Sequence, residues 1–414
     1  MSDVPVYKLR FKADDGSQFP DWEEKAFGDF VDTHLEKTSD KDKYPLYSLT
    51  IESGVQPKTD RYEREFLVKK EGDNYKIVPP NAFVYNPMNL RFGALKVNHE
   101  KFSVSVSGYY DVFSLKDDSV LAFWENYLVT PKMLNYYFSI ATGSLIEKLR
   151  VHYSQFVKIK KPLPSLPEQQ KIAEFLSTID TVIEKQKETV SAWEERKKGV
   201  MQKLFNQEVR FKADDGSEFP EWEEKSYLSI CNMFADGDWI ESKDQSDSGI
   251  RLIQTGNIGN GVFIDKCDKK KYISKETFDR LKCKEVFEGD ILISRLPSPA
   301  GRACIVPKLN ERMITAVDCT IIRTDKSIIL PDYCVQFMQS SKHSYYVASM
   351  MAGGTRQRIS RKNLEDELIS VPCLAEQQKI ADCLSSMDEV IEKQKATLAA
   401  WEELKKGLLQ QMFV

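Results

Sequence analysis

The stretch that decides this fold is EQQKIAEFLSTIDTVIEKQKETVSAWEERKKGVMQKLF, Glu168–Phe205, because it occurs twice. Its second copy, Glu376–Phe413, reads EQQKIADCLSSMDEVIEKQKATLAAWEELKKGLLQQMF, and 25 of the 38 positions are identical. In both copies apolar residues recur at spacings of three, four and seven, which places them on one face of a long helix. At 1.5 Å per residue such a helix extends roughly 57 Å. A narrow apolar stripe of that length must be buried, and the other copy, packed antiparallel, is the natural partner.

The residues before the first copy predict where its helix begins. Ser165-Leu-Pro-Glu168 has the form of a capping box, with Pro167 in the first helical turn. The second copy has Cys373 and Ala375 at the corresponding positions, so its cap is expected to be weaker.

Polar positions also agree between the two copies, which bears on what the helices contact. Two unrelated core helices, the alternative interpretation, would need only the apolar stripe to be alike. Shared polar positions suggest instead that an external partner touches both helices. The docking candidates are Glu168, Gln169, Lys185 and Gln186, with Glu376, Gln377, Lys393 and Gln394 in the second copy.

A second block is also repeated. Arg10–Lys25 reads RFKADDGSQFPDWEEK, and Arg210–Lys225 reads RFKADDGSEFPEWEEK. The chain is therefore ordered as this block, a variable segment and the helix, twice over, which predicts pseudo-two-fold symmetry. Trp22 and Trp222 in this block either dock a partner or anchor the block in a core, and the two readings are equally supported.

The variable segments, 26–164 and 226–372, show no comparable similarity and read as mixed α and β structure. Strands are predicted near 102–107, which alternates as a half-exposed strand does, and near 290–294 and 320–323. Helices are predicted near 119–141, 275–282 and 331–350. The fold class is α+β: two mixed α/β recognition domains separated by two long antiparallel helices forming a coiled coil. The expected division is 1–164 and 206–372 for the domains, and 165–205 and 373–414 for the helices.

Composition is that of an ordinary globular protein, with 41% hydrophobic and 29% charged residues. No run of about 18 apolar residues predicts a membrane span, and the N-terminal residues lack the apolar region of a secretory signal. All eight cysteines lie in the second half of the chain without a C-x-x-C pair, so neither zinc nor a disulfide framework is indicated. We expect a cytoplasmic protein.

Net charge neither excludes nor predicts a nucleic-acid partner. The four repeated blocks together carry −7 against a net charge of −4, so the remaining residues carry +3. The positive excess therefore lies outside the repeats, where recognition of a polyanion would require it.

No constellation of catalytic residues stands out. A phosphate-binding G-x-x-x-x-G-K-S/T loop is absent, and the four histidines lack metal-ligand spacing. Asn86-Pro87-Met88-Asn89 is similar to the Asn-Pro-Pro-aromatic motif of adenine methyltransferases, but it lacks the second proline and the aromatic ring that stacks on a flipped base. We expect no catalytic residue and no metal site.

The arrangement resembles the specificity subunits of type I restriction–modification systems. The similarity rests on the order of repeated block, variable segment and long helix, which occurs twice. It rests also on PSLPEQQKIA at 164–173 and PCLAEQQKIA at 372–381, each leading into a long helix with Lys-Lys-Gly near its end. FEGDILISR at 287–295 and NAFVYNP at 81–87 are similar to recurrent pieces of the family's target-recognition domains. The resemblance covers essentially the whole chain.

This resemblance implies a non-catalytic subunit that recognises double-stranded DNA at a bipartite site. Each recognition domain reads one half-site, and the helices space the domains and dock two copies of a modification subunit. That subunit uses S-adenosylmethionine to methylate adenine, so no cofactor is expected on this chain, and two motor-nuclease restriction subunits can join. The alternatives are a stand-alone DNA-modifying enzyme with an unfamiliar site and a protein-interaction scaffold.

Residues that contact DNA are expected on the loops of the variable segments, where Arg and Lys bind phosphate and Arg, Asn, Gln and Ser read base edges. In the first segment these are Lys58, Arg61, Arg64, Tyr85, Asn86, Asn89, Arg91 and Lys96. In the second they are Gln254, Asn257, Arg295, Ser298, Arg302, Arg356, Arg358 and Arg361. The stretch GGTRQR at 353–358 is the strongest single candidate, because glycines permit close approach of the backbone.

Overall fold

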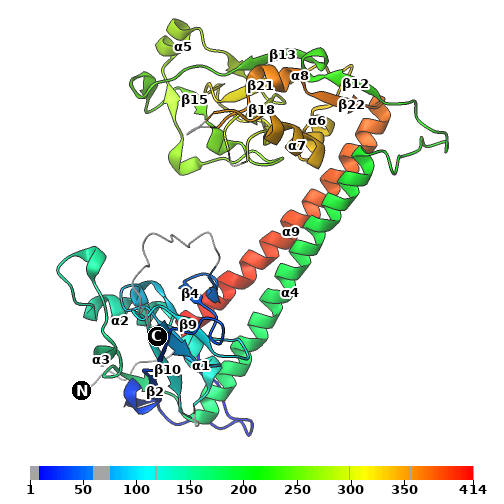
Figure 1. Ribbon diagram of the computed structural model, residues 1–414. Helices are drawn as coiled ribbons and strands as arrows, with labels where there is room; N and C mark the ends of the chain where they lie inside the picture. Colours follow the sequence, from blue (N-terminus) through cyan, green and yellow to red (C-terminus); the bar gives the residue numbers. More distant parts are fainter. Residues whose placement is uncertain (1–8, 59–74, 117–118, 298, 354–356, 414) are drawn as a thin grey trace. The chain divides into compact units, whose positions relative to one another are not determined.

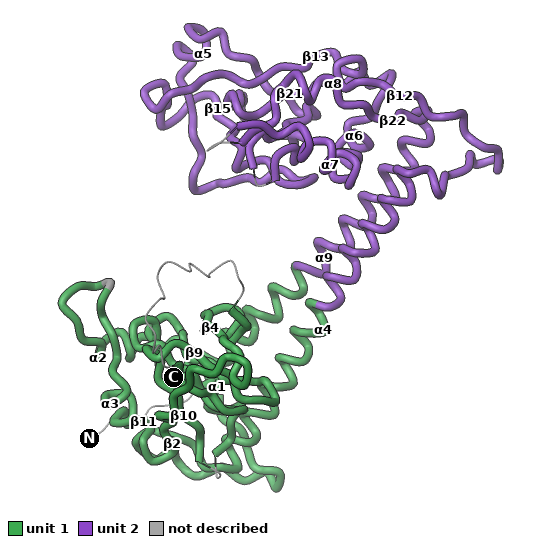
Figure 2. Tube along the Cα trace, in the orientation of Figure 1, with its two compact units in different colours: residues 1–187, 396–414 green, residues 188–395 purple. Residues whose placement is uncertain are grey.

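The computed structural model describes residues 9–58, 75–116, 119–297, 299–353 and 357–413. The chain forms two compact units, the first made of residues 1–187 and 396–414 and the second of residues 188–395 (Figure 2). Each long helix passes from one unit into the other, so each unit holds the beginning of one long helix and the end of the other (Figure 1). The division into four segments at 164, 205 and 372 stays a prediction.

The first unit is built on a four-stranded sheet of order β2-β10-β7-β8, in which all neighbours are antiparallel. A three-stranded sheet of order β3-β6-β9, the hairpin β4-β5 and the pair β1-β11 complete its strands. The bounds are β1 Glu23–Ala26, β2 Val31–His34, β3 Lys37–Thr38, β4 Tyr47–Thr50, β5 Gly54–Pro57, β6 Tyr75–Val78, β7 Phe83–Tyr85, β8 Leu95–Val97, β9 Val104–Val106, β10 Asp111–Leu115 and β11 Lys160–Leu163.

The second unit is built on a corresponding four-stranded antiparallel sheet of order β13-β21-β18-β19. It also has a five-stranded sheet of order β14-β16-β15-β20-β17 and the pair β12-β22. The bounds are β12 Glu223–Ser226, β13 Cys231–Asp236, β14 Gln245–Ser246, β15 Ile250–Ile253, β16 Tyr272–Ile273, β17 Glu285–Val286, β18 Ile291–Ser294, β19 Ala303–Ile305, β20 Met313–Thr315, β21 Cys319–Thr324 and β22 Leu368–Val371.

In the described residues of both units three short α-helices lie between the central sheet's last strand in sequence and the strand before the long helix, and the second unit has one more helix earlier in the chain. Before the first long helix come α1 Leu121–Tyr127, α2 Pro131–Ile140 and α3 Tyr153–Phe156, and the long helix itself is α4 Leu166–Phe205. The second unit adds α5 Lys275–Leu281, α6 Pro331–Met338, α7 Ser341–Met350 and α8 Arg361–Asp366 before α9 Leu374–Met412. In the described residues, no helix is long and apolar enough to cross a membrane.

The two variable segments therefore share a topology that their sequences do not reveal. In each, a strand following the repeated block pairs with the strand before the long helix, as β1 does with β11 and β12 with β22. In each, the central sheet has the same strand order and a short helix lies immediately before that last strand. The α+β class is confirmed, with one fold present twice.

The long helices pack antiparallel within each unit, as their stripes predict. In the first unit Lys405 Nζ of α9 lies 2.6 Å from Asp180 Oδ1 of α4. In the second unit Lys197 Nζ of α4 lies 2.7 Å from Asp388 Oδ1 of α9. These pairs are the same two positions of the repeat with the helices exchanged. The contact between α4 and α9, called the seam below, is therefore equivalent in the two units.

Each hydrophobic core includes both long helices. In the first unit Leu176 of α4 and Phe413, just after α9, are buried with the aromatic cluster around Phe27 and Phe156. In the second, Phe205 of α4 and Leu384 of α9 are buried with the residues around Tyr333. The end of each helix therefore stabilises the unit that the other helix begins.

Two helix predictions were too long. The helix predicted at 119–141 is α1 and α2, because Thr130 caps a new start, accepting a hydrogen bond from Met133 N at 3.4 Å, and Pro131 cannot continue α1. The helix predicted at 331–350 is α6 and α7, because the Ser340 hydroxyl caps α7 through His343 N at 3.3 Å. The strands near 290–294 and 320–323 are confirmed, as is the helix near 275–282.

The strand predicted at 102–107 is present as β9, but it is fully buried rather than half-exposed. Its polar residue, Ser105, is accommodated because its hydroxyl donates to the Tyr44 carbonyl at 2.9 Å. The alternating pattern therefore predicted the strand correctly, but the half-exposed position that it also predicted is wrong.

Candidate DNA interface and docking residues

The repeated block is fixed to its long helix by a buried carboxylate. In the first unit Arg10 Nε and one terminal nitrogen donate to Glu168 Oε1 and Oε2 at 3.1 and 2.9 Å, and Trp22 Nε1 donates to Oε2 at 3.0 Å. Glu168 is wholly buried. A buried carboxylate is stable only when its oxygens are paired in this way.

The second unit repeats the arrangement atom for atom. Arg210 donates to Glu376 at 3.1 and 2.9 Å, and Trp222 Nε1 donates to Glu376 Oε2 at 2.9 Å. For the two tryptophans, the structure supports the anchoring interpretation over docking. The capping box predicted at Ser165 is wrong, because Arg10 and Trp22 occupy the Glu168 carboxylate and the Ser165 hydroxyl has no hydrogen-bond partner among the described residues.

Gln169 and Gln377 also have internal roles. Gln169 Nε2 donates to the Pro164 carbonyl at 3.0 Å, and Gln377 Nε2 donates to the Pro372 carbonyl at 2.8 Å. Both side chains are buried. These glutamines and the two glutamates were predicted to dock a partner because they are shared polar positions. That reasoning fails for these four residues, because burial in their own unit explains why both copies keep them.

The remaining docking candidates lie nearer the middle of the helices. Lys185 and Lys393 are exposed, and Gln186 and Gln394 are half-buried, at equivalent positions of the two copies. Their assignment to a partner surface stays a prediction.

Most DNA candidates of the first unit divide into exposed and internal residues. Lys58 and Asn89 are exposed, whereas Asn86 folds back so that its Oδ1 accepts from Met88 N at 3.0 Å. Tyr85 is wholly buried and donates its hydroxyl to the Val151 carbonyl, so its predicted contact with DNA is wrong in this fold. Burial raises the pKa of this phenol well above its ordinary value. Arg61 and Arg64 lie outside the described residues.

Two further basic candidates of the first unit are held by protein groups. Arg91 donates to the Ile146 carbonyl at 2.7 Å and stacks over Phe92, with its guanidinium carbon 4.7 Å from the ring centre. Lys96 lines a cavity of about 530 Å³ that also contains Glu100, Glu125 and Glu184. Burial lowers the pKa of Lys96. Acidic walls disfavour phosphate, so Lys96 is a poor DNA contact.

In the second unit the Arg302 side chain holds two loops together, and we call it the Arg302 clamp; it is not available to contact bases. Its guanidinium donates to the carbonyl oxygens of Ile258 at 2.7 Å, Thr255 at 2.9 Å, Leu296 at 3.1 Å and Pro299 at 2.7 Å. Burial lowers its pKa. The predicted DNA contact is wrong for this residue because its donors are used, but the clamp joins two candidate loops, 254–258 and 295–302.

Asn257 and Arg295 are also internal. Asn257 accepts from Gln254 N at 3.0 Å and donates to the Ile264 carbonyl at 2.9 Å, which fixes its loop. Arg295 is 7% exposed and donates to the Val317 carbonyl at 2.7 Å. Both side chains are committed to backbone groups of their own unit, which argues against the predicted base contacts of these two residues.

Gln254, Arg358 and Arg361 remain the accessible candidates of the second unit. Gln254 is half-buried and the two arginines are exposed, Arg358 lying 3.6 Å from Asp318 and Arg361 2.9 Å from Glu365. Ser298 and Arg356 lie outside the described residues.

An isolated β-bridge occupies the same place in both units. A bridge joins Thr142 to Arg150 in the first and Ala352 to Arg358 in the second. The residue after each bridge is tied to the loop that follows the central strand: Val151 N donates to the Pro87 carbonyl at 3.0 Å, and Ile359 N to the Arg295 carbonyl at 3.2 Å. In each unit the residue after this bridge is therefore held beside the loop that follows the central strand, β7 or β18.

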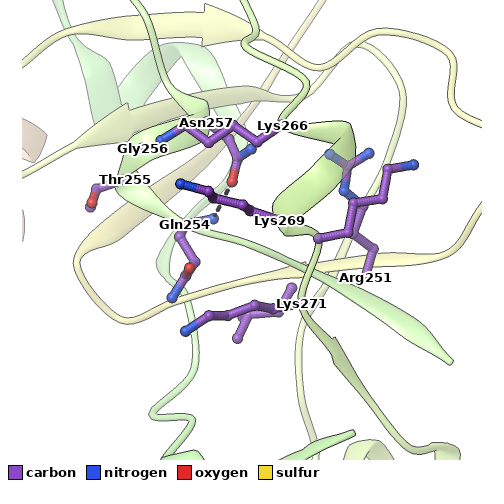
Figure 3. A pocket seen from close by; sticks show the side chains of 10 residues that line it. Arg251, Gln254, Thr255, Gly256, Asn257, Lys266, Lys269 and Lys271 are labelled. Carbon is purple, nitrogen blue, oxygen red and sulfur yellow. Dashed lines mark hydrogen bonds between the residues drawn. The ribbon is translucent and has the colours of Figure 1, made fainter. Parts of the chain in front are cut away.

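A basic surface that the sequence predictions missed lies beside the Gln254 loop. Lys266, Lys269, Lys270 and Lys271 line a cavity of about 170 Å³ with Gln254 (Figure 3). The sequence signal for this surface is the run Asp268-Lys-Lys-Lys-Tyr272. In the part of the chain that is described, no three His, Cys, Asp or Glu side chains gather as a metal site would require.

Comparisons with known proteins agree with this geometry. The sequence matches the family described as the type I restriction modification DNA specificity domain at residues 20–191 and again at 220–400. It is 25% identical over 264 residues to the type I restriction enzyme MjaVIII specificity subunit of Methanocaldococcus jannaschii, a match that covers 61% of each chain. It is 26% identical over 274 residues to the putative type I restriction enzyme MjaX specificity subunit of the same organism, across 64% of this chain and 60% of that one. The chain thus matches about three fifths of the length of these relatives.

Solved structures show the same fold. The S subunit of a type I restriction–modification system from M. genitalium aligns with a TM-score of 0.55 at 14% identity, covering 99% of both chains. A chain from a structure of type I system assembly and conformational transition aligns with a TM-score of 0.55 at 15% identity, covering 95% of this chain and 98% of that one. With both halves of the sequence matched by the family, this chain belongs to the type I restriction–modification DNA specificity family.

Proposed function

We propose that this chain is the DNA-specificity subunit of a type I restriction–modification complex and that it recognises a bipartite double-stranded target. The observation that carries the proposal is the double arrangement itself. Two units share one fold and one anchoring device, whereas their loops carry different side chains. Such a molecule offers like surfaces to two copies of a partner and unlike surfaces to two half-sites.

The chain is proposed to act without catalysing a reaction itself. The one motif that is similar to a catalytic motif, Asn86-Pro87-Met88-Asn89, is used internally, because Asn86 Oδ1 accepts from Met88 N at 3.0 Å. Methyl transfer to adenine would belong to the modification subunit and its S-adenosylmethionine, and cleavage to a motor-nuclease subunit when one joins. The exposed helical positions Lys185 and Lys393 are the proposed contacts for the two modification subunits.

Gel-shift titrations with and without the modification subunit test this proposal. The assembled complex should bind one set of duplexes far more tightly than random sequence, by roughly 10³-fold or more at physiological salt. Replacing residues 226–372 with the recognition segment of another specificity subunit should change one half-site and leave the other intact, as read by mapping methylated adenines. A complex indifferent to sequence, or methyl transfer by the purified chain alone, would reject it.

A further inference from the structure

The lysine-lined cavity of the second unit has a fixed base and a basic rim. Its base is the loop after β15, where the Asn257 amide and the Arg302 guanidinium hold the backbone. Lys266 reaches across this loop: a side chain added at Gly256 would come within 2.5 Å of Lys266 Nζ. Figure 3 shows Lys266, Lys269 and Lys271 extending to the same side as Gln254.

The remaining cations of this cavity are already neutralised. Arg251 is 1% exposed and forms ion pairs with Asp265 and, at 2.8 Å, with Glu311. Lys270 Nζ lies 3.1 Å from the same Glu311 oxygen. Two cations and two carboxylates therefore cancel beneath the rim. These cations are already paired and need no external anion.

Within the described ranges, the three lysines at the rim of the cavity, unlike Arg251 and Lys270, are not paired with a carboxylate. Lys266, Lys269 and Lys271 are exposed, and the described residues contain no ion-pair partner for any of them. Three uncompensated positive charges converge on one small opening, where a bound anion would be attracted by all of them. A cavity of about 170 Å³ is too small for a drug-sized ligand or cofactor, which occupy roughly 300–1,000 Å³. It suits a single phosphate group that belongs to a larger molecule.

We propose that Lys266, Lys269 and Lys271 grip phosphates of the DNA backbone next to the half-site read by the second unit. This inference rests on the proposed function. The lysines lie beside Gln254. The Arg302 guanidinium links the Gln254 loop to Leu296 and Pro299. Ile359, which follows Arg358, donates its backbone N–H to the Arg295 carbonyl. Phosphate contacts at this rim would fix the position of the duplex against those loops and carry no sequence information themselves.

A triple variant, K266Q/K269Q/K271Q, tests the proposal in the assembled complex with its modification subunit. The binding constant for a duplex carrying the mapped target is measured across a range of salt concentrations. Each phosphate contact contributes about 0.9 to the slope of log K against log salt concentration, so the slope should fall by about 1–3. Affinity at low salt should fall on the order of tenfold or more, and the methylated sequence should stay the same.

The matched control removes the same charge elsewhere on the second unit. Lys275, Lys308 and Lys326 are exposed and do not line the cavity, so K275Q/K308Q/K326Q should keep the wild-type slope. Equal loss in both triple variants, an unchanged slope in the rim variant, or a changed methylated sequence would overturn the phosphate grip. A wild-type complex without sequence preference would instead overturn the proposed function, so the two failures are distinguishable.

Discussion

Glu168 shows how one buried carboxylate organises a whole repeat. Arg10 and Trp22 come from a loop far away in sequence, and both donate to this side chain at the first turn of α4. Removing one partner of a buried charged network leaves the others unpaired, which costs more than the net value of the pair.

Glu168→Ala should therefore lower the free energy of unfolding of the first unit by about 3–5 kcal/mol. Urea denaturation followed by tryptophan fluorescence measures the change. The control is Glu174→Ala, an exposed position of the same helix, which should stay within about 0.5 kcal/mol of wild type. Equal effects of the two variants would show that the Arg10–Glu168–Trp22 contacts add no stability.

The buried pair of His343 and Glu367 should make stability depend on pH. Both carboxylate oxygens lie 2.9 Å from His343 Nδ1, and Nε2 lies 2.9 Å from the Gly301 carbonyl. Burial raises the pKa of Glu367, while the histidine partly offsets this. The folded chain therefore retains a proton that the unfolded chain releases near the ordinary glutamate value. This contribution is fully present below that value and is lost as the pH rises through the raised pKa.

Glu367→Gln removes this titration. The difference in free energy of unfolding, wild type minus variant, should fall as the pH rises above the ordinary glutamate pKa, with a slope of at most about 1.4 kcal/mol per pH unit. Chemical denaturation at a series of pH values gives the curve. A difference that rises with pH would contradict the direction of the pKa shift.

At this scale the sequence predicted the type of side chain better than its role. Arg302, Asn257 and Tyr85 have the chemistry of a DNA contact, yet each satisfies a backbone group or fills a core in this fold. Whether a donor faces solvent or a carbonyl depends on loops that are distant in sequence, and no local pattern contains that information. Lys269–Lys271 could have been noticed, because a run of three lysines is visible without a structure.

At the scale of elements, local signals predicted well what local forces determine. The apolar stripe predicted both long helices, α4 and α9, and their antiparallel packing, because an apolar face of that length requires a partner. The shared strand order β2-β10-β7-β8 and β13-β21-β18-β19 could not be predicted. Strand order results from long-range pairing, and different apolar residues satisfy the same pairing equally well.

Substitutions of Phe413 and Phe205 test whether each long helix ends in the core of the unit in which the other helix begins. In the first unit the ring centre of Phe413 lies 5.2 Å from that of Tyr127 and 5.9 Å from that of Phe123. In the second unit the ring centre of Phe205 lies 5.3 Å from that of Phe337. Phe→Ala at either position should cost about 3–5 kcal/mol in the unit that receives the ring. Hydrogen exchange should show F413A loosening residues 75–163 and F205A loosening residues 291–371. Loosening of the opposite unit, or of both equally, would contradict the assignment.

At the scale of the whole molecule, each unit is completed by the other repeat's helix. The first unit uses α4 up to residue 187 and α9 from residue 396, and the second uses the complementary halves. Equivalent residues close both seams, since Lys197 corresponds to Lys405 and Phe205 to Phe413. One repeat therefore contains every element of a complete unit, but its own helix cannot fold back to supply both halves.

A fragment of residues 1–207 should consequently form a homodimer, with Lys197 and Phe205 of each copy replacing the missing Lys405 and Phe413 of the other. Sedimentation equilibrium measures the mass. Lys197→Asp should weaken the dimer about 10- to 100-fold, because Lys197 is 7% exposed and a charged hydrogen bond contributes about 1.5–3 kcal/mol. Adding Asp180→Lys restores the opposite charges across the seam and should recover much of the affinity. A folded monomer, or a dimer indifferent to both substitutions, would show that the two repeats do not complete each other in this way.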